Sequence, residues 1–211
     1  MIDFDHCVLH LSPRIVMGSY WPDLSRYKNN GRIYGAQLRH GAMWFNGVNT
    51  NVNCGNHETL KPPELTIEVW VKNILTENTT YDQLILSTCG DNKPEHGYVL
   101  TWGWGNDLYW RAGDGTDWHN LCVINLPRGE KWYFIAATFR NGEQLLYVNG
   151  ELKDSNNLSF DIVYDSSPLL IGKAGTARLQ GFVGELLIYD VVRTPEQIRI
   201  DAQLTSPYGT H

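Results

Sequence analysis

Hydrophobic and polar residues alternate along most of this 211-residue chain. In residues 66–72, Ile67, Val69 and Val71 would face one side of a strand, and the residues between them would face the other. In residues 97–104, a tyrosine, a leucine and two tryptophans share one face. A period of two is typical of strands with one buried face, so the pattern predicts an all-β protein.

Two Asn-Gly pairs, at 141–142 and 149–150, separate short strand-like runs. Asn-Gly is the strongest short signal for a two-residue β-hairpin. We therefore expect a three-stranded meander over residues 131–154.

One helix is predicted, over residues 193–204. Thr194 suits the N-cap, Pro195 the first helical position, and Gln197 the third position after the cap. We expect this short C-terminal helix to pack on a sheet.

Composition narrows the classes of protein. Hydrophobic residues make up 42% of the chain, which is enough for a sizeable core. No apolar run approaches the roughly 18 residues of a membrane span, and the N-terminus lacks the pattern of a secretion signal. The net charge is -6 and no basic stripe is present, which disfavours nucleic acid. We expect one domain over residues 1–205 with a tail at 206–211, and no membrane insertion.

The four cysteines, at 7, 54, 89 and 122, contain no C-x-x-C pair, so neither zinc nor thioredoxin-type chemistry is expected. Three disulfide pairings remain open. Free, buried thiols are favoured, because cysteine packs as a small apolar residue.

Several phrases follow one another in a fixed order along the chain. They are DLSRYKNNGRIYGA (23–36), AMWFNGVNTNVNCG (42–55), LTIEVWVKN (65–73), KWYFIAATF (131–139), QLLYVNGEL (144–152), LLIGKA (169–174) and GFVGELLIYDVVRTPEQI (181–198). Together they resemble the laminin-G-like branch of the concanavalin A-like lectin and glucanase superfamily, as found in bacteria and viruses. The resemblance implies a two-sheet antiparallel jelly-roll sandwich, located outside the cell or on the surface of a virion or cell.

The resemblance also implies a structural calcium ion near the first of these phrases. Calcium takes six to eight oxygen ligands, and Asp23, Asn29 and Asn30 supply oxygens within one loop. Glu185, in the closing strand, could reach the same end of the sandwich. The alternative is that Asp23 only caps a turn, as aspartate often does.

A binding surface is predicted in residues 101–120, where tryptophans alternate with polar side chains. Flat aromatic rings stack on the C–H faces of sugars, while polar groups bond the hydroxyls. The candidate ligand-binding residues are Trp102, Trp104, Asn106, Asp107, Trp110, Arg111, Asp114, Asp117 and Trp118. Because most tryptophans are buried, some of these should fill the core, and we expect Trp104 and Trp118, next to turns, to be exposed.

Catalysis is not favoured. Laminarinase-type relatives carry E-x-D-x-x-E on one strand, and this motif is absent. Glu64 and Glu68 lie four apart with no acid between them, and Glu68 suits a structural role. The sequence therefore predicts a non-catalytic module that binds a glycan or glycoprotein. The alternative is a structural or adhesive surface protein that contacts proteins or itself, and a glycan hydrolase or lyase is the least favoured class.

Overall fold

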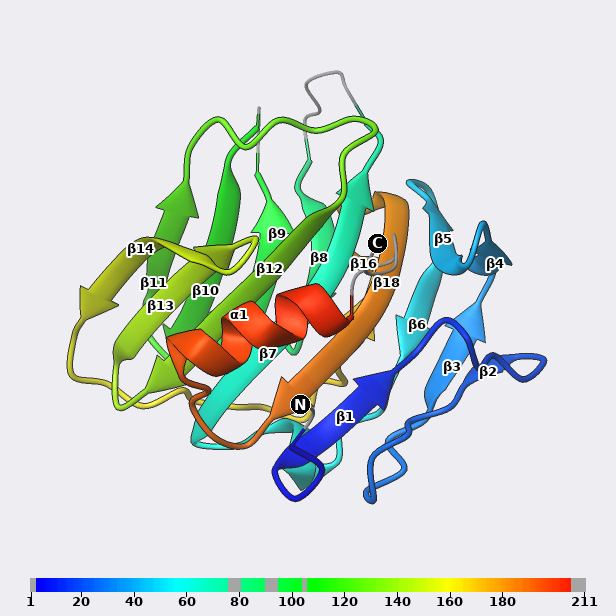
Figure 1. The fold of residues 1–211 in the computed structure, drawn as a ribbon. Coiled ribbons are helices and arrows are strands. Elements are labelled where there is room, and N and C mark those ends of the chain that lie inside the picture. The colour runs from blue at the N-terminus through cyan, green and yellow to red at the C-terminus, as the bar shows by residue number, and fades with distance from the viewer. Residues whose placement is uncertain (1–2, 76–80, 90–94, 104–105, 206–211) are drawn as a thin grey trace.

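The alternating segments form two large antiparallel sheets that pack face to face (Figure 1). The computed structural model describes residues 3–75, 81–89, 95–103 and 106–205. The prediction of an all-β, two-sheet sandwich with one short C-terminal helix is confirmed. The predicted tail at 206–211 lies outside the described residues.

Sheet A has eight strands in the order β14-β13-β12-β7-β18-β5-β4, with β1 also paired to β18. Its strands are β1 (Cys7–Leu11), β4 (Gln37–Arg39), β5 (Ala42–Asn46), β7 (Glu64–Asn73), β12 (Tyr133–Arg140), β13 (Glu143–Val148), β14 (Glu151–Asn157) and β18 (Gln180–Tyr189).

Sheet B also has eight strands, in the order β11-β10-β9-β8-β15-β6-β3-β2. They are β2 (Tyr20–Trp21), β3 (Gly31–Tyr34), β6 (Asn51–Asn53), β8 (Gln83–Ser87), β9 (His96–Trp102), β10 (Leu108–Asp114), β11 (Trp118–Val123) and β15 (Leu170–Ile171). A small hairpin, β16 (Lys173–Ala174) with β17 (Ala177–Arg178), and a 3₁₀ turn, η1 (Glu58–Leu60), complete the connections.

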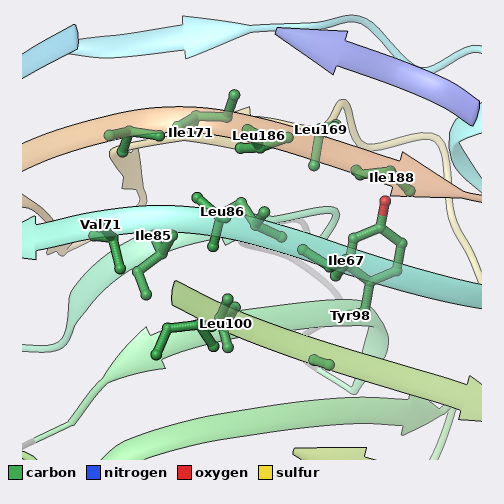
Figure 2. Packing of buried hydrophobic residues seen from close by; sticks show 14 of the residues in the cluster. Ile67, Val71, Ile85, Leu86, Tyr98, Leu100, Leu169, Ile171, Leu186 and Ile188 are labelled. Atoms are coloured by element: carbon green, nitrogen blue, oxygen red, sulfur yellow. The ribbon is translucent and has the colours of Figure 1, made fainter. Parts of the chain in front are cut away.

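The inner faces of the two sheets share one hydrophobic core (Figure 2). Ile67 and Val71 of β7 and Ile188 of β18 contribute from sheet A, and Ile85 and Leu100 contribute from sheet B. All five side chains are fully buried. The predicted alternation in β7 is confirmed, because its odd-numbered apolar residues enter this core while Glu68 and Trp70 face outward.

Both Asn-Gly pairs form the predicted two-residue hairpin turns. The φ angles are 49° and 85° at Asn141 and Gly142, and 53° and 81° at Asn149 and Gly150. Two successive left-handed residues match the twist of the flanking strands, which is why Asn-Gly is preferred there. The meander over residues 131–154 is therefore confirmed as β12, β13 and β14.

Helix α1 (Pro195–Leu204) covers part of the outer face of sheet A, where Figure 1 shows it crossing β7, β12 and β13. Thr194 and Gln197 form a reciprocal capping box at its start. Ile198 packs against a second, smaller cluster that includes Trp70, Phe134 and Tyr147. At ten residues, α1 is too short to cross a membrane, and no helix in the described part of the chain qualifies.

The expectation of free, buried thiols is confirmed for Cys7 and Cys54. Burial raises the pKa of the Cys7 thiol to about 12 and also raises the pKa of Cys54. Cys89 and Cys122 are only half-buried. The two buried cysteines therefore act as apolar packing residues rather than as reactive thiolates.

A buried charge cluster anchors the helix to the sheet. Arg193 is 2% exposed and lies between Glu68 of β7 and Asp201 of α1, both fully buried. The Arg193 guanidinium donates to the Asp201 carboxylate, and its Nε lies 3.8 Å from Glu68 Oε1. Burial, and then the charge of Asp201, raise the pKa of Glu68 well above its usual value, and Arg193 opposes this. Folding therefore shifts Glu68 towards its protonated form relative to the unfolded chain.

This cluster predicts that the stability of the protein falls as the pH rises, and that the substitution Glu68→Gln makes the stability less dependent on pH. A carboxyl whose folded pKa is raised loses stabilising effect as the pH rises above the unfolded value of 4.5. Because glutamine stays neutral, the variant should match the wild-type melting temperature near about pH 4 and exceed it by several degrees near about pH 8. Thermal unfolding across this pH range measures the effect. Glu64→Gln, at a partly exposed partner of Arg140, is the matched control, and parallel curves for the wild type and Glu68→Gln would contradict the prediction.

Candidate binding face on sheet B

The predicted binding segment, residues 101–120, folds into the end of β9, all of β10 and the start of β11. The turn with Asn106 and Asp107 lies at one end of β10, and the turn with Asp114 and Asp117 at the other. A seven-residue strand separates its ends by about 20 Å. The structure therefore does not bring the predicted polar residues together into one site.

Two of the predicted ligand-binding tryptophans are core residues, which corrects that expectation. Trp102 and Trp110 are both fully buried. Their indole N–H groups donate to the backbone oxygens of Leu126, at 3.3 Å, and Thr138, at 3.2 Å. Both lie on the inward face of their strands, alongside Tyr98, so they stabilise the sandwich and cannot contact a ligand. Trp104 lies outside the described residues.

Asn106 and Asp107 brace the connection that follows β11. The Asn106 side-chain oxygen accepts a bond from Arg128 Nε at 3.2 Å. Asp107 Oδ1 accepts from the backbone N–H of Asn125 at 3.0 Å. Asn125 has a positive φ of 55°, and the Asp107 contact supports this strained position. Both predicted residues thus have structural partners.

Asp114 organises the turn between β10 and β11. Its Oδ1 accepts from the Thr116 hydroxyl and from the backbone N–H groups of Thr116 and Asp117, at 2.7–2.8 Å. Its Oδ2 lies 2.8 Å from His119 Nε2. The bond to His119, followed by those to the turn, holds the pKa of Asp114 well below its usual value. The carboxylate is therefore committed to the turn, and the neighbouring Asp117 is exposed.

The remaining two predicted residues, Arg111 and Trp118, do lie together on the outer face of sheet B. Arg111 is directly opposite Asn120 in the β10–β11 pairing, and Trp118 is opposite Gly113. Gly113 itself is buried, and the backbone of Glu95 fills the space where a Cβ would lie, so this glycine allows the Glu95 backbone to approach the strand. We call this surface the Trp118 face, and its members are Asp82, Tyr109, Arg111, Trp118 and Asn120.

Arg111 is the polar centre of the Trp118 face. Its guanidinium carbon lies 4.9 Å from the centre of the Tyr109 ring, and its Nη1 lies 3.5 Å from Asp82 Oδ2. Its Nε has no hydrogen-bond acceptor within the described parts of the chain. Burial raises the pKa of Asp82, and Arg111 opposes this rise. Because this Nε is buried, a contact between Arg111 and a polar ligand has to come from the 28% of the side chain that is exposed, beside the Tyr109 ring.

Sequence reasoning missed Tyr109 and Asp82 as members of this face. Tyr109 could have been found from the alternation, because it lies between Leu108 and Trp110, which both enter the core. Asp82 precedes β8, and only the position of β8 in the sheet brings it to Arg111. No local pattern carries that information.

The predicted calcium loop is already saturated by protein donors. Asp23 is 2% exposed, and its Oδ1 accepts from the backbone N–H groups of His10 and Ser25, both at 2.8 Å. Its Oδ2 accepts from the Ser25 hydroxyl at 2.7 Å and from the Asn29 N–H at 2.8 Å. These four bonds occupy the roughly four lone-pair directions of a carboxylate.

The other proposed calcium ligands are also engaged. Asn30 Oδ1 accepts from the Asp23 N–H at 2.9 Å, and Asn29 directs its amide nitrogen to Val8 and Thr59. Glu185 Oε1 lies 2.7 Å from His10 Nε2, and within the described residues no hydrogen bond or ion pair joins it to the loop. Within the described residues, no group of three or more His, Cys, Asp or Glu is placed to hold a metal. The residues therefore do not fit a calcium ion, and the alternative, a capped turn, agrees with the geometry.

The acids considered for catalysis do not form a pair on an open surface. Glu64 Oε2 accepts from Arg140 Nε at 2.9 Å across the sheet. Glu68 is fully buried in the charge cluster beside α1. A glycosidase needs two carboxyl groups that flank a bound glycosidic bond, and these two side chains do not provide them.

This geometry predicts that calcium does not stabilise the protein and that Asp23 does so without metal. Adding calcium after chelation should leave the melting temperature unchanged. Asp23→Asn should lower the free energy of unfolding by about 3 kcal/mol, because buried donors lose their acceptor. Denaturant unfolding with calcium and with chelator measures both effects. A calcium-dependent rise in melting temperature that Asp23→Asn abolishes would contradict this prediction and support a calcium site at Asp23.

The chain shares its fold with toxin binding domains of known structure. The botulinum neurotoxin serotype D binding domain is 20% identical, with 94% of this chain and 52% of that chain covered and a TM-score of 0.73. The binding domain of Paraclostridial Mosquitocidal Protein 1 is 17% identical, with 95% of this chain and 52% of that chain covered and a TM-score of 0.76. The botulinum neurotoxin DC binding domain in complex with rat synaptotagmin II is 14% identical, with 97% of this chain and 53% of that chain covered and a TM-score of 0.74. The chain thus spans about half the length of each.

Family membership rests on the sequence itself. No curated protein matches the chain. Residues 46–199, which are more than half of the sequence, match the family described as the Concanavalin A-like lectin/glucanases superfamily. These residues run from the end of β5 into α1 and include most of both sheets. The chain therefore belongs to the Concanavalin A-like lectin/glucanases superfamily.

Proposed function

We propose that this chain is a non-catalytic binding module that recognises a carbohydrate through the Trp118 face. The observation that supports this most is the placement of half-buried Trp118 and Tyr109 on either side of Arg111, on one face of sheet B. Aromatic rings can stack on the apolar faces of a sugar, and Arg111 and Asn120 can bond its hydroxyls. The acids considered for catalysis are engaged in structural contacts, which supports binding rather than hydrolysis.

The similar structures support a binding role but leave two classes of partner. The botulinum neurotoxin DC binding domain has been solved with SialylT, and also with rat synaptotagmin II, a protein. The second candidate function is therefore an adhesive surface module that binds a protein. For either partner, we propose a location outside the cell or on a surface, as in a secreted, cell-attached or virion protein.

The glycan proposal is tested by binding to a panel of immobilised glycans. Trp118→Ala should weaken binding to any specific hit by about fivefold, since stacking on one ring contributes about 1 kcal/mol. Arg111→Gln should also weaken it, because charge-assisted bonds to hydroxyls are lost.

Tyr34→Ala is the control for Trp118→Ala. Tyr34 is a 43% exposed aromatic residue of β3, near the other edge of the same sheet. Its removal should leave glycan binding unchanged. Specific glycan binding that survives both Trp118→Ala and Arg111→Gln would refute this site, and binding to proteins alone would favour the second candidate.

A further inference from the structure

The outer face of sheet A carries a row of aromatic and cationic residues beyond α1. Gln37 of β4 pairs directly with Trp44 of β5, Trp44 with Phe182 of β18, and Phe182 with Lys72 of β7. Four strands thus contribute one residue each to a straight line across the sheet. At about 4.8 Å per strand, the row spans about 14 Å. Trp132, just before β12, continues it, with its ring 5.8 Å from Lys72 Nζ.

The rings of this row are accessible but held in place. Trp44, Phe182 and Trp132 are all half-buried. The Trp132 and Phe182 ring centres lie 6.3 Å apart. A Cβ added to Gly184 would lie 3.6 Å from the Trp132 ring, so this glycine leaves the indole room to lie close to the sheet. The rings therefore form a low platform rather than protruding side chains.

Arg39 is fixed over this platform as a cation. Its guanidinium carbon lies 3.6 Å from the centre of the Trp44 ring. Gln37 Oε1 accepts from both its Nε, at 3.0 Å, and its Nη2, at 2.7 Å. No carboxylate of the described residues lies within ion-pair distance of Arg39. A planar guanidinium that is already ordered, with donors left over, is suited to binding a carboxylate or sulfate.

Lys72 places a second positive charge in the row. Its Nζ lies 4.9 Å from the centre of the Phe182 ring and 3.0 Å from Glu130 Oε2. The Glu130 side chain is 86% exposed, so this ion pair is weak and a ligand anion can replace it. Farther along β18, Glu185 is paired with His10. The platform therefore offers two cations to a ligand, although the whole chain has a net charge of -6.

We propose that this row is a second binding site, on the opposite side of the sandwich from the Trp118 face, and that it takes an acidic polysaccharide. The alternation of rings and cations along one line complements a chain of sugar rings that carry carboxylate or sulfate groups. The apolar ring faces stack on the platform, and the anionic groups reach Arg39 and Lys72. A membrane surface is less suited, because the three rings are half-buried and do not protrude.

The test measures binding to polygalacturonate, which carries carboxylates, to heparin, which adds sulfates, and to neutral dextran. The full chain should bind one or both acidic polymers, more weakly as salt rises, and should not bind dextran. Arg39→Gln should weaken this binding by about tenfold or more, because a charge-assisted contact is lost. Trp44→Ala should weaken it as well.

Arg32→Gln is the matched control, because Arg32 also lies over an aromatic ring, that of Tyr34, but on sheet B. It should leave acidic-polymer binding within about twofold of the wild type. Trp118→Ala should also retain binding to the acidic polymers. The experiment therefore distinguishes the proposal for the Trp118 face from the proposal for this site. Near-UV circular dichroism establishes that each variant is folded, and exposed Arg39 keeps the test valid if Trp44→Ala unfolds.

Four results would overturn the proposal. They are no binding to either acidic polymer, equal binding to dextran, equal losses in Arg39→Gln and Arg32→Gln, and unchanged binding in Arg39→Gln. Binding of the wild type, but not of Arg39→Gln, to phosphatidylserine vesicles without any polysaccharide binding would instead identify a membrane-contacting surface.

Discussion

The side-chain alternation of the strands is the constraint on which the rest of this structure depends. Each strand directs every second residue into the core between the sheets and the others to an outer face. Trp102 and Trp110 point to the inner face of sheet B and are therefore buried. Trp118 of β11 points to the outer face and reaches the surface. The tryptophan-rich segment thus contains both core and surface tryptophans, and the position of each one in the alternation of its strand decides which it is.

Polar side chains that resemble a site by composition are largely used to build the fold. Asp114 accepts several bonds from its own turn, Asp23 accepts bonds from its own loop and from the backbone of β1, and Glu68 lies in the buried cluster that anchors α1. Such groups have to be bonded or paired, because an unsatisfied buried polar group costs about 1–3 kcal/mol. The fold itself therefore requires polar side chains in these loops, and their presence alone does not indicate a ligand site.

Among the described residues, the one α-helix packs on the outer face of sheet A, and no α-helix covers the outer face of sheet B. Helix α1 packs on Trp70 and Phe134, and the row that includes Trp44 and Phe182 lies beyond it. On sheet B, Arg111 is joined to Asp82, whereas Arg39 on sheet A has only Gln37 and the Trp44 ring as described partners. This difference in charge compensation is the physical basis for assigning different ligands to the two faces.

The sequence by itself determined the elements and the family. Alternation predicts the strands, Asn-Gly pairs predict both hairpin turns, and Thr194 with Gln197 predicts the helix start, because each depends on residues only a few positions apart. The tertiary structure alone decided which polar groups are saturated and which side chains meet. Asp82 meets Arg111, and Trp44 meets Phe182, only through pairing between strands distant in sequence. That register is decided by packing of the whole core, which no local pattern contains.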